Sequence, residues 1–279
     1  MSACEVCPTA RLEKLLLPTD GSKFSEGAIR EAINLAKKCS SKIFALSVVE
    51  FNPEFMARAP QLVEEYEKET RQHLESVKAR ASKEGVDCEI IVHEGEEAFQ
   101  YIVDEAARNK VEMIIMGRHG RTGLKRLMMG SVTARTIGHC LCKLMVVPES
   151  AKVSYDNILV ATDGSKYSDA ASREAISIAK RCGSDLIVLS VATKEKNLSD
   201  AKKSVEKISE VAVKEGLKVK TLTPRGIPYE VIVKTAEQKN AGVIVIGCHG
   251  RTGIERLLMG SVTERVIGHA NCAVLVVKR

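Results

Sequence analysis

The hydrophobic and polar positions of this chain follow one pattern twice. A short apolar run, typical of a strand buried on both faces, precedes a longer segment with apolar residues at the three- and four-residue spacing of an amphipathic helix. Segment 24–38 shows the helical spacing at Ala28, Ile29, Ala32 and Ile33. In the first half we predict strands at 14–17, 43–49, 88–92, 113–116 and 144–147, and helices at 24–38, 62–84, 96–108 and 131–139.

The second half repeats this order of elements. Its predicted strands are 158–161, 186–191, 218–222, 243–246 and 273–277, and its predicted helices are 168–181, 198–215, 229–239 and 261–268. Strands that alternate with helices form a parallel sheet covered on both faces, and right-handed connections make that sheet doubly wound. The fold class predicted is therefore α/β, with two tandem Rossmann-like domains that each contain a doubly wound five-stranded parallel sheet.

The two halves also repeat each other in sequence. Thr-Asp-Gly-Ser-Lys at Thr19–Lys23 recurs at Thr162–Lys166, an offset of 162 − 19 = 143. The glycine-rich segments described below begin at Gly117 and Gly247, an offset of 247 − 117 = 130. The first half therefore holds 143 − 130 = 13 extra residues, which we place around 51–70.

This duplication sets the expected domain organisation. A chain of 279 residues is long enough for two domains. We divide it into residues 1–150 and 151–279, with a short linker at 149–155. The final strand of each domain would leave an apolar edge, and such edges invite pairing. We therefore expect strands 144–147 and 273–277 to pair in antiparallel fashion about a pseudo-two-fold axis.

A glycine-punctuated connection follows the fourth predicted strand of each half. It has the spacing G-x2-G-x9-G-S and lacks both the lysine of a P-loop and the dinucleotide fingerprint G-x-G-x-x-G. Glycines let the backbone approach a ligand closely, and the amino end of the following helix suits phosphate. The residues with this spacing are Gly117, Gly120, Gly130 and Ser131, and Gly247, Gly250, Gly260 and Ser261.

An aspartate after the first strand of each half is the second candidate feature. Asp20 and Asp163 each precede Gly-Ser, so either could cap the next helix or bond a ribose hydroxyl or an adenine edge. Ligands of doubly wound sheets bind at the carboxyl ends of the strands. If strand 1 neighbours strand 4, the aspartate and the glycine loop form one composite site. Val48 and Val191 could line an apolar slot for a base, or they are ordinary core valines.

Charged residues of the loops allow two interpretations. Arg118, Arg121, Lys125 and Arg126 could reach phosphate oxygens, or they form a solvated basic loop. His119 and its counterpart His249 could act as general bases, but no carboxylate partner is identifiable, so a structural role is expected. Ser131 is a candidate N-cap of the last helix of the first half.

These motifs resemble those of universal stress proteins of the nucleotide-binding type. The resemblance covers about 13–148 and 156–278, almost the whole chain, and implies a tandem member with a fold like that of adenine nucleotide alpha-hydrolases. It implies that ATP or another adenine nucleotide (ADP or AMP), with Mg²⁺ as an optional companion, is the ligand. The contacts it implies are Asp20, Met116, Gly117, Gly120, Gly130, Ser131 and Val132 in the first half, and Asp163, Ile246, Gly247, Gly250, Gly260, Ser261 and Val262 in the second.

The resemblance also implies an assembly. Members dimerise through their last strand, and the two halves of a tandem member pair like such a dimer, so an intrachain pseudo-dimer and a homodimer are both expectations. The second half departs from the first at two positions. Ala161 stands where the first half has Pro18, and Cys248 stands where it has Arg118.

Composition excludes several classes of protein. The net charge of +6 is spread along the chain, aromatic residues make up 4% and tryptophan is absent, so nucleic-acid binding is not expected. The first residues show no signal peptide and no apolar run approaches the length of a membrane span, so we predict no membrane partner and a cytoplasmic location. The nine cysteines are then expected to be free thiols.

Cys4 and Cys7 form a CxxC pair in the N-terminal arm. The pair could be redox-active, or half of a zinc site completed by Cys140 and Cys142. An arm whose cysteines bind nothing is the interpretation that we favour.

Three functions follow from these features. The first is a cytoplasmic nucleotide-gated regulator of the stress response. The second is a slow ATPase or adenylyl-transfer enzyme on the same fold, for which no metal-ligand cluster, base–nucleophile pair or Walker lysine is found, so no catalytic or metal-binding residue is assigned. The third is a thiol or metal module built on Cys4 and Cys7.

The two sites are expected to be unequal. The first loop carries Arg118, Arg121, Lys125 and Arg126, or +4, whereas the second carries Arg251, Glu255 and Arg256, or 2 − 1 = +1. We therefore predict that the first half prefers ATP. We also predict that Gly130→Val and Gly260→Val each abolish binding in their own half, because the side chain blocks phosphate and disfavours the backbone angles needed there.

Overall fold

The computed structural model describes residues 6–51, 54, 58, 60–121, 129–250 and 259–278. Within them, ten strands form a single sheet in the order β3-β2-β1-β4-β5-β10-β9-β6-β7-β8. Each half has the doubly wound order that the sequence predicts. The strands are β1 Lys14–Pro18, β2 Lys42–Glu50, β3 Cys88–Gly95, β4 Met113–Gly117, β5 Lys143–Val147, β6 Asn157–Ala161, β7 Asp185–Leu189, β8 Val219–Leu222, β9 Val243–Gly247 and β10 Ala273–Val277.

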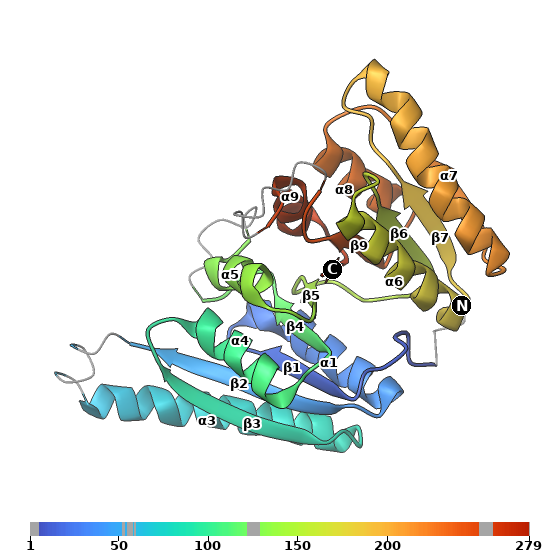
Figure 1. Cartoon of the computed structure of the whole chain (residues 1–279). Helices are drawn as coiled ribbons and strands as arrows, with labels where there is room; N and C mark the ends of the chain where they lie inside the picture. The colour runs from blue at the N-terminus through green and yellow to red at the C-terminus, as the bar shows by residue number, and fades with distance from the viewer. Residues whose placement is uncertain are drawn as a thin grey trace.

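Helices cover both faces of this sheet (Figure 1). Side chains of α1, α3, α6 and α7 pack into the core of one face, and those of α4, α5, α8 and α9 pack into the core of the other. Each core runs through both halves of the chain. The helices are α1 Glu26–Cys39, α3 Pro60–Lys83, α4 Ala98–Asn109, α5 Ser131–His139, α6 Lys166–Cys182, α7 Leu198–Lys214, α8 Pro228–Gln238 and α9 Ser261–His269.

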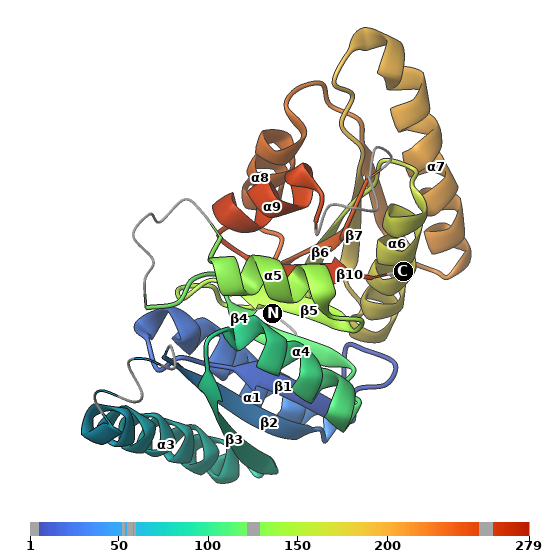
Figure 2. The same ribbon diagram turned by 60° about the vertical axis from the view of Figure 1, so that its left-hand side comes forward.

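The two halves meet through their final strands, as the sequence predicts. β5 and β10 lie side by side at the centre of the sheet (Figure 2) and pair in antiparallel fashion, with Leu275 opposite Met145. Every residue of β10 is buried. The apolar edges of the two domains are therefore covered by each other, and the halves are related by a pseudo-two-fold axis.

Element boundaries differ from the predicted ones by a few residues. The helix expected at 24–38 begins with a short 3-10 turn, Lys23–Ser25, before α1. β7 ends at Leu189, so Val191 follows this strand and does not belong to it. Part of the segment around 51–70, where the extra residues of the first half were placed, lies outside the described residues.

The N-terminal arm is packed against the domains, which corrects the expectation of an arm whose cysteines bind nothing. Cys7 forms a disulfide with Cys39, the last residue of α1, and Cys182 at the end of α6 is also disulfide-bonded. Thr9 is buried, and Arg181 Nε donates to the backbone oxygen of Cys7 at 2.8 Å.

The expectation that all cysteines are free thiols is therefore wrong for these three residues. Local spacing could not reveal a pair whose members are 32 residues apart, since the chain must first dock the arm at the end of α1. Cys140 and Cys142 are free and form no site with Cys7, whereas Cys4 lies outside the described residues. In the described part of the chain, no helix is long and apolar enough to cross a bilayer.

Candidate functional site

The turn after β1 and the loop after β4 lie at the same edge of the sheet. β1 pairs in parallel with β4, with Leu15 opposite Met113, and β6 pairs with β9 in the same way. Strand 1 therefore neighbours strand 4 in both halves, as a composite site requires. Asp20 and Asp163 follow β1 and β6, and Gly117 and Gly247 stand at the carboxyl ends of the neighbouring strands β4 and β9.

Asp20 joins the turn to the loop directly. Its Oδ1 accepts hydrogen bonds from the backbone nitrogen of Ser22 at 3.0 Å and from its hydroxyl at 2.7 Å. Its Oδ2 accepts a bond from the backbone nitrogen of Arg121 at 2.7 Å. In the second half, Asp163 Oδ1 accepts from the Ser165 nitrogen at 3.0 Å. Each aspartate thus closes a turn by bonding the backbone nitrogen of the residue two positions on. Asp163 is not the N-cap of α6, because the Ser165 hydroxyl takes that role.

The second glycine of each loop is needed because this carboxylate approaches it closely. A Cβ at position 120 would lie 2.9 Å from Asp20 Oδ2, and one at position 250 would lie 2.6 Å from Asp163 Oδ2. Real Cβ atoms do not come so near, so a side chain at Gly120 or Gly250 would push the aspartate away. These glycines let the loop close onto the turn.

Gly130 and Gly260 have no such explanation among the described residues. Both have extended backbones, with φ −65° and ψ 147° at Gly130 and φ −71° and ψ 139° at Gly260, which any residue can adopt. An added Cβ would meet its nearest described neighbour at 3.4 Å in each case. The prediction that valine disfavours the backbone angles here is therefore wrong. Among the described residues there is thus space for a Cβ, though little more, in front of both glycines.

That space lies at the amino ends of α5 and α9. Gly130 and Gly260 are the N-caps and carry no capping side chain, so Ser131 is the first helical residue and not the cap that the sequence analysis expected. Ser131 and Ser261 are exposed. The first N–H groups of a helix have no partner within it. In the described part of each half, this edge therefore carries an exposed serine at the amino end of a helix whose N-cap residue supplies no capping side chain.

The first turns of the two helices differ in charge. α5 has no acidic residue in its first turn, whereas α9 has Glu264 there. Thr133 Oγ1 donates to Gly117 O at 3.1 Å, and Thr263 Oγ1 donates to Gly247 O at 2.9 Å, so each helix is fixed to the end of its strand in the same way. The geometry is thus equal in the two halves, but α9 presents an added negative charge.

The apolar candidates lie on the face of the sheet that α5 and α9 cover. Met116 and Ile246 are buried in this core as the residues before the first glycines. The other four candidates are partly buried and pack against the same core; they are Val48, Val132, Val191 and Val262. The structure therefore brings all six to the same face as the open helix ends, where they could flank a planar ring.

The two described basic residues of the first loop, Arg118 and Arg121, bind different parts of the molecule. The Arg118 guanidinium is turned into the boundary between the halves, where Nη1 donates to Gly268 O at 2.9 Å and to Ala270 O at 3.0 Å. Burial lowers the pKa of Arg118. The interpretation of Arg118 as a phosphate ligand is therefore corrected. Arg121 is exposed, and its Nε donates to Asp20 O at 2.7 Å. The remaining charged loop residues lie outside the described residues; they are Lys125, Arg126, Arg251, Glu255 and Arg256.

The two loop histidines pack against aromatic rings. The centroid of His119 lies 6.1 Å from that of Phe24, and the centroid of His249 lies 5.0 Å from that of Tyr167. These contacts fix the histidines to the segment that follows the first strand of each half. They agree with the structural role that the sequence analysis expected.

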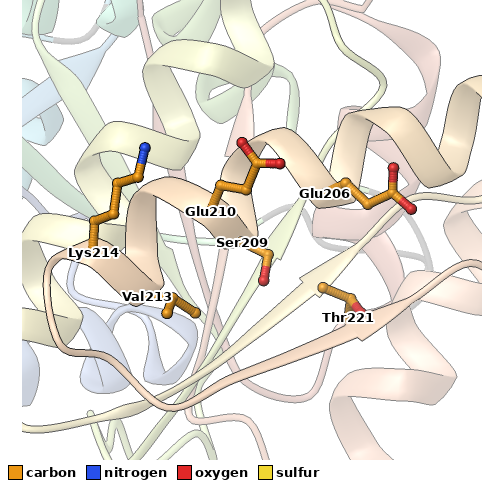
Figure 3. A pocket seen from close by; sticks show the side chains of 6 residues that line it. All are labelled: Glu206, Ser209, Glu210, Val213, Lys214 and Thr221. Carbon is orange, nitrogen blue, oxygen red and sulfur yellow. The ribbon is translucent and has the colours of Figure 1, made fainter.

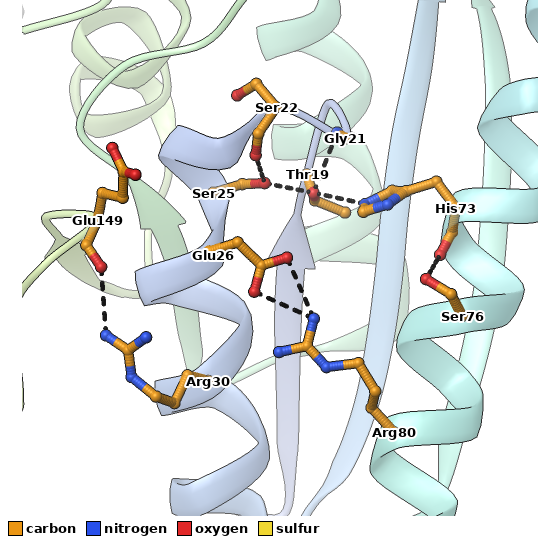
Figure 4. Close-up of polar contacts among 10 residues, drawn as sticks. All are labelled: Thr19, Gly21, Ser22, Ser25, Glu26, Arg30, His73, Ser76, Arg80 and Glu149. Carbon is orange, nitrogen blue, oxygen red and sulfur yellow. Dashed lines mark hydrogen bonds and ion pairs between the residues drawn. The ribbon is translucent and has the colours of Figure 1, made fainter.

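Sequence reasoning missed His73, which holds the turn that carries Asp20 (Figure 4). His73 Nε2 lies 2.9 Å from Thr19 Oγ1, Thr19 Oγ1 donates to Ser25 Oγ at 2.9 Å, and Ser25 Oγ donates to Ser22 O at 2.8 Å. Because each hydroxyl proton is already used, His73 Nε2 must be the donor to Thr19. Burial lowers the pKa of His73. In the sequence, the only sign of this role was a histidine in a predicted helix rich in charged residues.

The second half lacks this histidine. Thr162 Oγ1 donates to Ser168 Oγ at 3.1 Å, which repeats the Thr19–Ser25 contact. Counting back from Gly216 as from Gly85, the position of His73 is taken by Ser204, whose hydroxyl donates to Asp200 O of its own helix. The turn of the first half is therefore held by a contact from the neighbouring helix α3 that Ser204 of α7 does not make in the second.

A hollow of the described surface lies away from these residues. It has a volume of about 440 Å³ and lies between α7 and β8, lined by Val213, Thr221 and the charged side chains of α7 (Figure 3). None of the residues singled out by the sequence is among its lining. Among the described residues, no group of three or more His, Cys, Asp or Glu side chains is arranged to hold a metal ion.

Comparison with known proteins agrees with this architecture. The chain matches the universal stress protein family over residues 11–148 and again over 154–278. It is 36% identical over 141 residues to a universal stress protein of Methanocaldococcus jannaschii. This alignment covers 45% of this chain and 83% of that protein.

Solved structures show the same fold. The crystal structure of a universal stress protein from Archaeoglobus fulgidus DSM 4304 superposes with a TM-score of 0.77 and 24% identity, covering 95% of this chain and 98% of that one. A second universal stress protein from Archaeoglobus fulgidus, in complex with dAMP, is 27% identical over 44% of this chain and 97% of its own, with a TM-score of 0.38. The family match extends over nearly the whole chain in two consecutive copies, and the chain therefore belongs to the universal stress protein family.

Proposed function

We propose that each half binds one adenine nucleotide at the carboxyl edge of the sheet, and that the protein acts as a nucleotide-gated regulator in the stress response. The observation that carries this proposal is that a glycine precedes both α5 and α9 without a reason in the described structure. Gly130 and Gly260 need neither a special backbone angle nor relief from a described neighbour. A ligand bound close to the backbone would leave no room for a side chain at these positions, which would explain the glycines.

The phosphates belong at the helix amino ends. The N–H groups of Ser131 and Val132 and the Ser131 hydroxyl are the donors in the first half, and Ser261 and Val262 take the same roles in the second. A helix amino terminus stabilises negative charge through its unpaired donors and its dipole. Neither helix end is capped by a side chain of its own N-cap residue, which leaves these donors open for a phosphate.

The nucleoside belongs between the aspartate turn and the partly buried valines. Asp20 Oδ1 already accepts two hydrogen bonds from Ser22, whereas Oδ2 accepts one from the Arg121 nitrogen and can accept a further bond from a ribose hydroxyl. Val48 and Met116 flank the same edge in the first half, and Val191 and Ile246 do so in the second. Because a family member has been solved with dAMP, adenine nucleotides are the first ligands to test.

The regulatory role follows from the position of the sites. Nucleotide bound at this edge would change the surface that the chain presents to a protein partner. We take residues 1–150 and 151–279 as the two domains, paired within the chain as a pseudo-dimer through β5 and β10. A cytoplasmic location and a further homodimer of the whole chain complete the proposal.

Identification of co-purified nucleotide tests the ligand. Purified protein is denatured, and the released small molecules are separated and identified by mass spectrometry. Calorimetric titration with ATP, ADP and AMP, with and without Mg²⁺, and with GTP as the control base, gives the affinities. We expect adenine nucleotides to bind two per chain and GTP to bind more weakly. Failure of all three adenine nucleotides to bind would refute the proposal. A kcat for ATP hydrolysis above about 1 s⁻¹ would favour an enzyme instead.

A further inference from the structure

Two free cysteines lie together at the carboxyl end of α5, the end of this helix that faces away from the candidate nucleotide site. Cys140 is the C-cap of α5, and the chain bends at Leu141 and Cys142 before β5 begins. This bend brings the two thiols into hydrogen-bonding contact, and Cys140 Sγ also lies 3.6 Å from the backbone oxygen of Cys142. Two thiols in contact are the reactants from which a disulfide forms.

A cation from the other half stands beside this pair. Lys278 Nζ donates to the backbone oxygen of Ile137, in the last turn of α5, and Lys278 also bonds the thiol of Cys248. The hydrogen bond from the Cys142 thiol and the positive charge of Lys278 lower the pKa of Cys140, although burial opposes them. The contact between the thiols raises the pKa of Cys142. Because the thiolate is the nucleophilic form of cysteine, Cys140 is the attacking sulfur and Cys142 keeps its proton.

Cys142 connects the pair to the surface. It lines a hollow of about 350 Å³ whose walls include Leu141, Val277 and Lys278. Cys140 is only 3% exposed, and its sulfur contacts Cys142. An oxidant must therefore be small to reach the Cys140 sulfur, which favours hydrogen peroxide over a bulky disulfide.

The second half contains a natural control for this site. At an offset of 272 − 142 = 130 residues, Cys272 takes the position of Cys142, and Ala270 takes that of Cys140. Cys272 is half-buried, as Cys142 is, and burial raises its pKa to about 11. Cys272 thus has a similar exposure, but an alanine stands where the first half has the attacking thiol.

We propose that Cys140 and Cys142 form a redox site that is oxidised by hydrogen peroxide to a disulfide. The Cys140 thiolate attacks one peroxide oxygen and the O–O bond breaks, which gives a sulfenic acid on Cys140 and a hydroxide that takes up a proton to become water. The Cys142 sulfur then bonds the Cys140 sulfur and gives its proton to the departing hydroxyl, which leaves as a second water. Peroxide is reduced and the two thiols are oxidised. The site does not depend on the proposed nucleotide binding.

Peptide mapping of the full chain tests this site. Folded protein is treated with a limiting amount of hydrogen peroxide, denatured without reduction, alkylated with N-ethylmaleimide and digested with trypsin. Both cysteines then lie in one tryptic peptide, 136–143, and Cys272 lies in another, 266–278. We expect peptide 136–143 to escape alkylation at both sulfurs and to lack the mass of two hydrogens, while Cys272 is alkylated. Dithiothreitol should restore both thiols.

Variants identify the role of each group. In Cys142→Ser, the sulfenic acid on Cys140 has no partner thiol and should be trapped by dimedone. Cys140→Ala, which copies the second half, should make Cys142 as slow to oxidise as Cys272. Lys278→Met should shift the pH profile of oxidation to higher pH, because the Cys140 thiolate loses a stabilising charge. Arg11→Met removes a charge from the same hollow and should leave that profile unchanged.

Three results would contradict this assignment. If peptide 136–143 is oxidised no faster than Cys272, the two cysteines are not a redox site. A disulfide that joins Cys140 to Cys248 instead would show that the wrong pair has been assigned. A pH profile that is the same in Lys278→Met and wild type, with equal melting temperatures, would overturn the role of the lysine.

Discussion

Two glycines of the same loop illustrate how differently single residues serve this site. Gly120 is crowded, because a Cβ there would lie 2.9 Å from Asp20 Oδ2. Gly130 is less crowded, because its nearest described neighbour, the backbone oxygen of Arg118, would lie 3.4 Å from a Cβ, which is an ordinary van der Waals contact. The fold of the loop therefore requires a glycine at position 120, whereas no described neighbour requires one at position 130.

Alanine and valine substitutions should separate these roles. We expect Gly120→Ala to lower the free energy of unfolding by about 1–3 kcal/mol through overpacking. Gly130→Val should lower it by less than Gly120→Ala does, because a Cβ there makes only ordinary contacts with its described neighbours, yet abolish nucleotide binding in the first half. Urea unfolding and calorimetric titration provide the two readings. Full-strength binding at both sites in a Gly130→Val, Gly260→Val double variant would mean that phosphate does not approach these glycines.

Glu31 is a second residue whose environment sets its chemistry. Its side chain is buried in α1, and its Oε1 accepts a hydrogen bond from the hydroxyl of Tyr155, in the linker between the halves, at 3.2 Å. Burial raises the pKa of Glu31 from 4.5 to about 7, and the Tyr155 bond opposes this rise. Between these two values the folded chain binds a proton that the unfolded chain has lost. Stability therefore falls as the pH rises from 4.5 to 7.

Glu31→Gln removes the ionisation and can keep the bond to Tyr155. We expect the variant to be more stable than wild type at pH 8, by at most about 3 kcal/mol from the size of the pKa change. The difference should shrink towards pH 5, where Glu31 is neutral in the folded chain. Melting curves of both proteins across this range test the sign. A stability difference independent of pH would show that Glu31 does not titrate in this window.

At the scale of elements, the ends of helices determine what each helix does. The amino ends of α5 and α9 stay open at the sheet edge, and their carboxyl ends are held by cations from the opposite half. The carboxyl end of α1 is held differently, by the Cys7–Cys39 disulfide to the N-terminal arm. Arg181 near the end of α6 binds the backbone of Cys7. The arm therefore links equivalent helices of the two halves.

Removal of this disulfide should destabilise the protein. The bond joins residues separated by 32 positions, and closing a loop of this size in the unfolded chain contributes about 3–4 kcal/mol. Cys7→Ser, Cys39→Ser and the double variant should lose equal stability, since each removes the same bond. Cys142→Ser, which changes a free cysteine, is the control. Additive losses in the double variant would show that the two cysteines act separately.

At the scale of the whole molecule, one continuous sheet places two similar sites in unequal surroundings. The charge count that predicted this inequality included Arg118. Its guanidinium instead donates to the carboxyl end of α9 across the boundary between the halves. The described residues supply another source of inequality, because Glu264 stands in the first turn of α9 where α5 has Ala134. An acidic residue there opposes a phosphate at the same helix end.

We therefore still expect the first half to bind ATP more tightly than the second. Glu264→Ala should raise ATP affinity in the second half, by a factor of a few from a contribution of about 0.3–1 kcal/mol. The gain should shrink as salt rises, because screening weakens exposed charges. Titration of Gly130→Val protein with and without Glu264→Ala, at low and high salt, measures it. Ala134→Glu in Gly260→Val protein is the mirror-image control and should weaken the first half.

The sequence by itself determined the order of elements, the duplication and the position of both loops. These features depend on hydrophobic periodicity and on local spacing, which are visible along the chain. It also indicated the pairing of β5 with β10, because an apolar strand that ends a domain needs a partner. It predicted that Asp20 and the glycine loop are neighbours on the condition that strand 1 lies beside strand 4, and the pairing of β1 with β4 meets that condition.

Only the tertiary structure decided where individual side chains go. Arg118 meets α9, His73 meets Thr19 and Cys7 meets Cys39 because the sheet and its helices bring distant segments together. Such contacts depend on side-chain direction across a packed boundary, for which the sequence carries no periodic signal. The N-cap at Gly130 was missed by one residue for a related reason, since backbone angles at a helix end are set by the neighbouring loop.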